Sequence, residues 1–202
     1  MGGPVALSWQ PPLFPSPAGP LERLTLEPGC WVDHAVAWLP GPDDVFGELV
    51  ATLPWAERDR MMYGRRVAEP RLTARWPSEG MAMPRVLDEA RAALSERYEV
   101  DLDSVGFNLY RDGGDSVAWH RDRIPVSIER PVVALVSLGA PRVFRLRPRG
   151  GGTSIAFNLG SGDLLVTGGQ TQRQWEHAVP KQRSAGPRVS IAFRHSSGNG
   201  PE

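Results

Sequence analysis

The stretch VGFNLYRDGGDSVAWH, residues 105–120, decides the fold class of this chain. Residues 105–110 and 116–120 are short runs rich in apolar and aromatic residues, as is typical of β-strands. The Asp112-Gly113-Gly114-Asp115 segment between them is a hairpin signal. Further short runs, separated by Gly, Pro and Asp turns, follow at residues 132–138, 143–147, 154–159, 163–166 and 188–194. This succession of short strands predicts a jelly roll or barrel.

Two helices are expected before these strands, at residues 43–53 and from Pro84 to Tyr98. Asp43 or Asp44 would cap the first helix, and Pro84 would stand in the first turn of the second. Each helix has an apolar face, formed by Val45, Leu49 and Leu53 in the first and by Val86, Leu87, Ala90, Ala93, Leu94 and Tyr98 in the second. Helices that precede a run of strands predict an α+β, mainly β fold, with the helices packed outside the jelly roll.

The length of 202 residues suits one domain with its own hydrophobic core. Residues 1–20 contain six prolines, and we expect them to form an arm without regular structure. We assign residues 21–195 to a single domain and residues 196–202 to a C-terminal tail. Residues 56–82 show no clean period, so we expect a long, partly ordered loop that serves as a binding lid.

Composition is that of an ordinary globular protein, with 41% hydrophobic and 23% charged residues. Cys30 is the one cysteine, which excludes an intrachain disulfide and a zinc cluster built from several thiolates. The sequence shows neither a signal peptide nor an apolar run long enough to cross a bilayer. We therefore expect a cytoplasmic monomer with no membrane partner.

The net charge of zero conceals an uneven distribution. Residues 1–130 contain 14 arginines and 20 acidic residues, whereas residues 131–202 contain nine basic and three acidic residues. A basic half can follow a phosphate backbone, although a solvated surface explains the same charges. Charge alone therefore leaves a nucleic-acid partner open.

Candidate metal ligands stand in the segment Trp119-His120-Arg121-Asp122. Residues two apart in a strand point to the same side, so His120 and Asp122 can offer an imidazole and a carboxylate to one ion. His177 lies far enough along the chain for a distant strand to return beside the first. Two histidines and one carboxylate on one face form the facial triad of non-haem iron(II) oxygenases. A His-x-Asp pair alone is also common on ordinary surfaces, and we interpret His34 and His195 as structural or exposed.

The last predicted strand, residues 188–194, carries two arginines on one face. Its other face is apolar and must pack against protein, whereas Arg188 and Arg194 are separated by small residues. Arginine binds carboxylates through a flat pair of donors, and two guanidiniums in one cavity repel unless anions occupy it. A dicarboxylate such as 2-oxoglutarate would supply both anions; the alternative is an exposed face with two solvated arginines. Asn108 and Tyr110 also share a strand face, and they can complete the hydrogen bonding of a bound acid.

In this order, the motifs resemble the AlkB family of nucleic-acid demethylases. The resemblance covers residues 105–194 and extends more loosely to Glu69-Pro70-Arg71-Leu72. Each motif is short, but the ordered set is specific. It consists of Asn108-x-Tyr110, His120-x-Asp122, Ser137-Leu138-Gly139 with Arg142, Gly162-Asp163-Leu164-Leu165, Trp175-x-His177-x-Val179-Pro180, and Arg188-x5-Arg194.

The resemblance implies a double-stranded β-helix, with iron(II) bound by His120, Asp122 and His177. It implies O2 and 2-oxoglutarate as cosubstrates, the latter held by Asn108, Tyr110, Arg188 and Arg194. It also implies that the loop within residues 56–82 resembles the family's nucleotide lid. Its candidate contacts with bases and phosphates are Met61, Met62, Tyr63, Arg65, Arg66 and Trp76. A lid that packs on itself is the alternative.

One position departs from the family. Members often carry a second acidic residue two positions after the metal-binding aspartate, where it faces the substrate base; this chain has Ile124 there. An aliphatic group cannot accept a hydrogen bond from an exocyclic amine. We therefore expect the metal chemistry to be unaffected and the discrimination among bases to be weaker.

The predicted activity is oxidative demethylation of N-alkylated bases, such as 1-methyladenine or 3-methylcytosine, in DNA with single-stranded character. One alternative keeps the chemistry and changes the substrate to RNA, a free nucleoside or a small molecule. A second is a nucleic-acid-binding protein without catalysis, which has no need of the triad. A third is a zinc hydrolase, which would leave Arg188 and Arg194 without a role.

Overall fold

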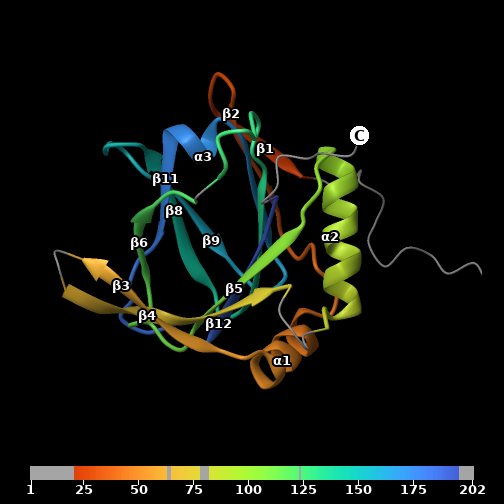
Figure 1. Ribbon diagram of the computed structural model, residues 1–202, viewed down its shortest axis with the longest axis vertical. Coiled ribbons are helices and arrows are strands. Elements are labelled where there is room, and N and C mark those ends of the chain that lie inside the picture. Colours follow the sequence, from red (N-terminus) through yellow and green to blue (C-terminus); the bar gives the residue numbers. More distant parts are fainter. Residues whose placement is uncertain (1–20, 63–64, 78–81, 123, 196–202) are drawn as a thin grey trace, which may run out of the picture.

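The computed structural model describes residues 21–62, 65–77, 82–122 and 124–195, except for the side chains of residues 60–67. This part of the chain forms two antiparallel β-sheets, with helices outside them (Figure 1). The large sheet has the strand order β1-β2-β10-β7-β12-β5-β4-β3, and the small sheet has the order β6-β11-β8-β9. The prediction of a mainly β jelly roll with supporting N-terminal helices is confirmed.

The elements have the following bounds. The helices are α1 (Pro42–Thr52), α2 (Arg85–Tyr98) and the short α3 (Thr171–Gln174). The large sheet contains β1 (Glu22–Glu27), β2 (Cys30–Ala35), β3 (Ala56–Met62), β4 (Arg65–Trp76), β5 (Ser104–Tyr110), β7 (Val133–Gly139), β10 (Leu164–Gly169) and β12 (Arg188–Arg194). The small sheet contains β6 (Val117–His120), β8 (Arg142–Pro148), β9 (Ile155–Leu159) and β11 (Trp175–Val179).

The main core lies between the large sheet and the two longer helices. Leu49 of α1 and Leu87 of α2 are fully buried there, against apolar side chains of β5, β7 and β12. A second core fills part of the space between the sheets, where Leu135 of the large sheet meets Phe144 and Leu146 of the small one. No helix in the described part of the chain is long and apolar enough to span a membrane.

The two faces of strand β12 contact different parts of the interior. Val189, Ile191 and Phe193 point to the helices, and all three are fully buried. Successive residues in a strand face opposite sides, so Ser190 and Ala192 face the space between the sheets. The small size of these two side chains leaves room there for a cavity.

Residues 56–82 contain a hairpin, and the prediction of a long loop is wrong. Strand β3 pairs with β4, and β4 pairs with β5 in the register Leu72↔Leu109, so the hairpin extends the large sheet. Leu72 and Ala74 pack into the main core, between the large sheet and the helices, whereas Arg71 and Thr73 face the cavity. This period of two was obscured because the inward face carries arginines instead of the usual apolar residues.

The turn at residues 112–115 is not the turn of a β-hairpin. Strand β5 belongs to the large sheet and β6 to the small one, so the turn carries the chain from one sheet to the other. The guanidinium of Arg142, which is fully buried, donates to the carbonyls of Asp112, Asp115 and Pro180. The Arg142 side chain thereby holds the segment that carries the chain from the large sheet to the small one.

The start of α1 also differs from the prediction. Gly41 is the N-cap, in the left-handed conformation with φ of 57°, and Pro42 is the first helical residue. Asp43 and Asp44 therefore lie in the first turn, where their charges favour the positive end of the helix dipole. In α2, Pro84 is the N-cap and the helix begins at Arg85.

Candidate functional site

Three candidate metal ligands meet at the edge of the small sheet. His177 of β11 stands directly opposite His120 of β6 in the strand register, and their ring centroids are 4.2 Å apart. Oδ1 of Asp122 lies 3.9 Å from Nε2 of each histidine. One ligand atom from each of the three residues lies within 4.8 Å of the others. The structure thus brings together the residues that the sequence singled out, although β6 ends at His120 and Asp122 stands in the following loop.

The electrostatics of this cluster suit a divalent cation. Burial lowers the pKa of His177 to about 4, so its imidazole is neutral at pH 7 and can offer a lone pair. Burial alone would raise the pKa of Asp122, but the charge of Arg194 and the neighbouring His177 outweigh it and hold that pKa below its usual range. Two imidazoles and one carboxylate on one side fit the facial triad of iron(II), which leaves other positions open.

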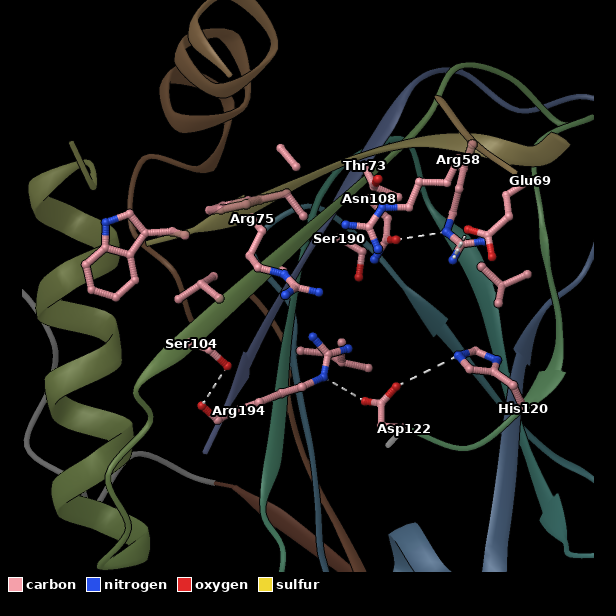
Figure 2. Close-up of a pocket in the computed structure, with 18 of the residues that line it drawn as sticks. Arg58, Glu69, Thr73, Arg75, Ser104, Asn108, His120, Asp122, Ser190 and Arg194 are labelled. Atoms are coloured by element: carbon pink, nitrogen blue, oxygen red, sulfur yellow. Dashed lines mark hydrogen bonds and ion pairs between the residues drawn. The ribbon is translucent and has the colours of Figure 1, made fainter. Parts of the chain in front are cut away.

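The triad opens on a cavity of about 1000 Å³ between the two sheets (Figure 2). Its walls come from β4, β5 and β12 of the large sheet and from β6, β8 and β11 of the small sheet. Several predicted site residues line it: Trp76, Asn108, Tyr110, His120, Asp122, Ile124, His177 and Arg194. The cavity is therefore large enough for more than a metal ion.

Arg188 lies beside this cavity, behind Tyr110. Its side chain is 1% exposed, its Nε donates to Ser137 Oγ over 2.8 Å, and its guanidinium carbon is 5.2 Å from the centre of the Tyr110 ring. Nη1 of Arg188 is buried without a hydrogen-bond partner among the described residues. A buried cation with an unsatisfied donor is costly, and an anionic ligand would remove that cost.

Arg194 and Asn108 are already engaged by protein groups. Arg194 Nε donates to Asp122 Oδ2 over 2.9 Å, and Asn108 Oδ1 accepts from Arg71 Nε over 2.8 Å. The second arginine of the strand thus contacts a metal-ligand candidate. Asn108 lines the cavity, and Arg71 holds its amide oxygen.

The predicted lid residues are only partly visible. Tyr63 lies outside the described residues, as do the side chains of Met61, Met62, Arg65 and Arg66, whose backbones belong to β3 and β4. Trp76 lines the cavity, but its ring also packs into the main core, with the Arg91 guanidinium 5.5 Å away.

Sequence reasoning missed several polar residues of the site. Glu69 and Arg71 of β4 line the cavity and form an ion pair, and Ser190 lines it next to Arg188. Ser137 orients Arg188. In the sequence, Glu69 and Arg71 belong only to a loosely matching motif, and nothing separates either serine from other serines in strands.

Comparison with known proteins identifies this architecture. Residues 44–194 match the 2OG-Fe(II) oxygenase superfamily. The bovine (Bos taurus) alpha-ketoglutarate-dependent dioxygenase alkB homolog 3 is 32% identical over 200 residues, which cover 89% of this chain and 68% of that protein. The DNA oxidative demethylase ALKBH2 of Arabidopsis thaliana is 27% identical over 193 residues, covering 74% of this chain and 60% of that protein.

Solved structures agree on the fold. The structure of OsALKBH1 superposes with a TM-score of 0.61 and 17% identity, covering 86% of this chain and all of that chain. A 2OG-Fe(II) oxygenase family oxidoreductase from Burkholderia pseudomallei gives a TM-score of 0.56 at 17% identity, covering 86% and 88%.

The fold and site therefore define a dioxygenase of the 2OG-Fe(II) superfamily, with Fe(II), 2-oxoglutarate and O2 as the cofactor and cosubstrates. Within it, the chain belongs to the AlkB family.

Proposed function

We propose that this protein oxidatively demethylates N-alkylated bases, such as 1-methyladenine and 3-methylcytosine, in DNA with single-stranded character. The observation that carries the proposal is a single cavity bordered by the His120, Asp122 and His177 cluster and, behind Tyr110, by a buried arginine with an unsatisfied donor. The relative called a DNA oxidative demethylase supports the substrate class.

In this proposal, His120, Asp122 and His177 hold iron(II). Arg194 donates to Oδ2 of Asp122, and Oδ1 faces the two histidines, where it would be available to the metal. When bound, iron with 2-oxoglutarate and O2 supplies the oxidation: 2-oxoglutarate is converted to succinate and carbon dioxide, and the N-methyl group is hydroxylated and lost as formaldehyde.

Arg188 would receive a carboxylate of 2-oxoglutarate. Nη1 is the donor that the carboxylate would satisfy, and Ser137 holds the guanidinium in place. Asn108, Tyr110 and Arg194 line the same cavity and are proposed as the other contacts. The low polarity around Arg188 strengthens a charge-assisted hydrogen bond, because little water competes for the donor.

A nucleic-acid base would enter from the side of the β3–β4 hairpin. Arg58 of β3 and Arg121, which follows β6, are exposed and line the cavity, where they can meet phosphate oxygens. Because the ligand cluster is recessed, a base stacked in a duplex cannot reach it, and the base must be unpaired or flipped. We propose that residues 21–195 form the one domain that carries all of these groups.

Formaldehyde release tests this function. The purified protein, loaded with iron(II), would be given a methylated single-stranded DNA, the matching RNA and the methylated nucleoside at equal concentration. We expect release from DNA to be the fastest, and His120→Ala and Asp122→Ala to abolish release from all three. Faster release from RNA or nucleoside would replace the DNA assignment while leaving the dioxygenase chemistry in place.

A further inference from the structure

Glu69 lines the cavity that His120 also lines. It comes from β4, and Figure 2 shows it above the His120 ring in this view. Its side chain is 20% exposed. Arg71 Nη2 lies 3.0 Å from Oε2, whereas Oε1 has no partner among the described residues. One oxygen is therefore held in place and the other remains able to accept a hydrogen bond.

The position of this carboxylate is fixed by a chain of polar contacts. Arg71, with a side chain 15% exposed, pairs with Glu69 through Nη2 and donates from Nε to Oδ1 of Asn108 over 2.8 Å. Glu69, Arg71 and Asn108 thus form one network across β4 and β5. An acceptor that is oriented before the ligand arrives loses less entropy on binding than a freely rotating one.

The other acidic side chains that line the cavity are Asp59, Asp103 and Asp122, and Ile124 lines it where an acid was expected. Ile124 is aliphatic, and Asp122 is engaged by Arg194 and the histidines. Asp59 also lines the cavity, but it is exposed on β3, where water competes for its oxygens. Glu69 combines partial burial with an orientation that Arg71 holds.

We propose that Glu69 determines the base specificity of the enzyme, by accepting a hydrogen bond from the exocyclic amine of an N-methylated base. This rests on the proposed function. Methylation at N3 of cytosine or N1 of adenine gives a ring that carries positive charge at neutral pH and an amine beside the methyl group. A carboxylate binds such a base through charge and hydrogen bond together. A carbonyl in place of the amine would face the carboxylate oxygen and be repelled.

The test compares two bases that differ in the exocyclic group and in the charge that goes with it. Single-stranded oligonucleotides with 3-methylcytosine or 3-methyluracil at the same position are given to the wild type and to Glu69→Gln, and kcat/KM is measured for each. The wild type should prefer 3-methylcytosine. In Glu69→Gln the preference should fall by about tenfold or more, because a charge-assisted hydrogen bond is lost and the amide can donate to the carbonyl. Glu69→Asp should retain part of the preference.

Two controls separate specificity from structural damage. Asp59→Asn removes an equal charge from the same wall and should leave the ratio unchanged. The KM for 2-oxoglutarate should stay the same in Glu69→Gln, which shows that Asn108 has not moved. An unchanged base ratio in Glu69→Gln would overturn the role of Glu69 while the demethylase function stands. Failure of the wild type to act on either oligonucleotide would overturn the proposed function itself and this inference with it.

Discussion

Arg194 and Asp122 form the contact that joins the two sheets at the metal site. Nε of Arg194, at the end of β12 in the large sheet, donates to Oδ2 of Asp122 over 2.9 Å. Asp122 follows β6 of the small sheet, and its other oxygen faces His120 and His177. The carboxylate is thereby oriented by one sheet and presented to the ligands of the other.

Replacement of Arg194 by Ala should weaken metal binding. Oδ2 of Asp122 would lose its donor, and the carboxylate would rotate. Loss of a group that orients a metal ligand typically reduces affinity by about 10- to 100-fold. Calorimetric titration with Mn²⁺ measures the affinity without turnover. Arg145→Ala is the matched control, because that arginine of β8 is exposed and donates to Ser154, just before β9. Equal affinities in both variants would contradict the orienting role.

Replacement of Arg188 by Ala should weaken 2-oxoglutarate binding. One charge-assisted hydrogen bond contributes about 1.5–3 kcal/mol, so a two-pronged contact is worth well over tenfold in affinity. Arg188→Lys should restore only part of it, because an ammonium lacks the fork. The dissociation constant of 2-oxoglutarate for the Mn²⁺-loaded protein is the measurement, and Mn²⁺ affinity shows whether the site is intact. If that dissociation constant is the same in Arg188→Ala as in the wild type, Arg188 does not bind 2-oxoglutarate.

Gly106 leaves the space that Arg194 occupies. A Cβ at this position would lie 2.8 Å from Nη1 of Arg194. Since Nη1 is the tip of a flexible side chain, Gly106→Ala should fold normally but displace the guanidinium from Asp122. We expect a severalfold loss of Mn²⁺ affinity, with no further loss in the double variant with Arg194→Ala.

Gly47→Ala is the control for the Gly106 variant. Gly47 lies in α1, and nothing stands within 4 Å of an added Cβ. This change should raise the free energy of unfolding by about 0.5–1 kcal/mol and leave metal affinity unchanged. If the effects of Gly106→Ala and Arg194→Ala on Mn²⁺ affinity were additive, Gly106 would not act through Arg194.

Tyr98 should set an alkaline limit to stability. Burial, with the nearby Asp33 carboxylate, raises the pKa of Tyr98, whose hydroxyl donates to Asp33 Oδ2 over 2.9 Å. A pKa that is higher in the folded than in the unfolded protein stabilises the fold. This contribution is fully present below the pKa of tyrosine in the unfolded chain, about 10, and is lost as the pH rises above it. Tyr98→Phe should lower the free energy of unfolding at pH 7 by about 1–3 kcal/mol. Between pH 7 and 11, the free energy of unfolding measured with urea should fall less steeply in the variant than in the wild type. Equal slopes in the two proteins would contradict this role of Tyr98.

The sequence revealed the strands and ligands whose patterns are local. The alternation in β12 and the His-x-Asp spacing are visible along a few residues, so the fold class and the meeting of His120 with His177 were predictable. Strand β4 was missed because its inward face is charged, and a charged face lacks the apolar period that marks strands. These arginines can face inward because a cavity lies there. The cavity arises from the packing of the two sheets, which cannot be read along one strand.

The pairing of Arg194 with Asp122 could not be predicted either. Both residues were expected in the site. Whether Arg194 contacts the carboxylate of a bound ligand or that of a protein residue depends on distances across the two sheets. Similarly, nothing in the sequence separated Ser137 from other serines. The cytoplasmic location and the monomeric state stay predictions.

The register between His120 and His177 also determines when the metal site can exist. The last ligand arrives only when β11, almost at the end of the domain, has been synthesised and has paired with β6. A growing chain on the ribosome therefore carries two of the three ligands without being able to enclose the ion. The three ligands can therefore enclose an ion only after β11 has paired with β6 in the small sheet.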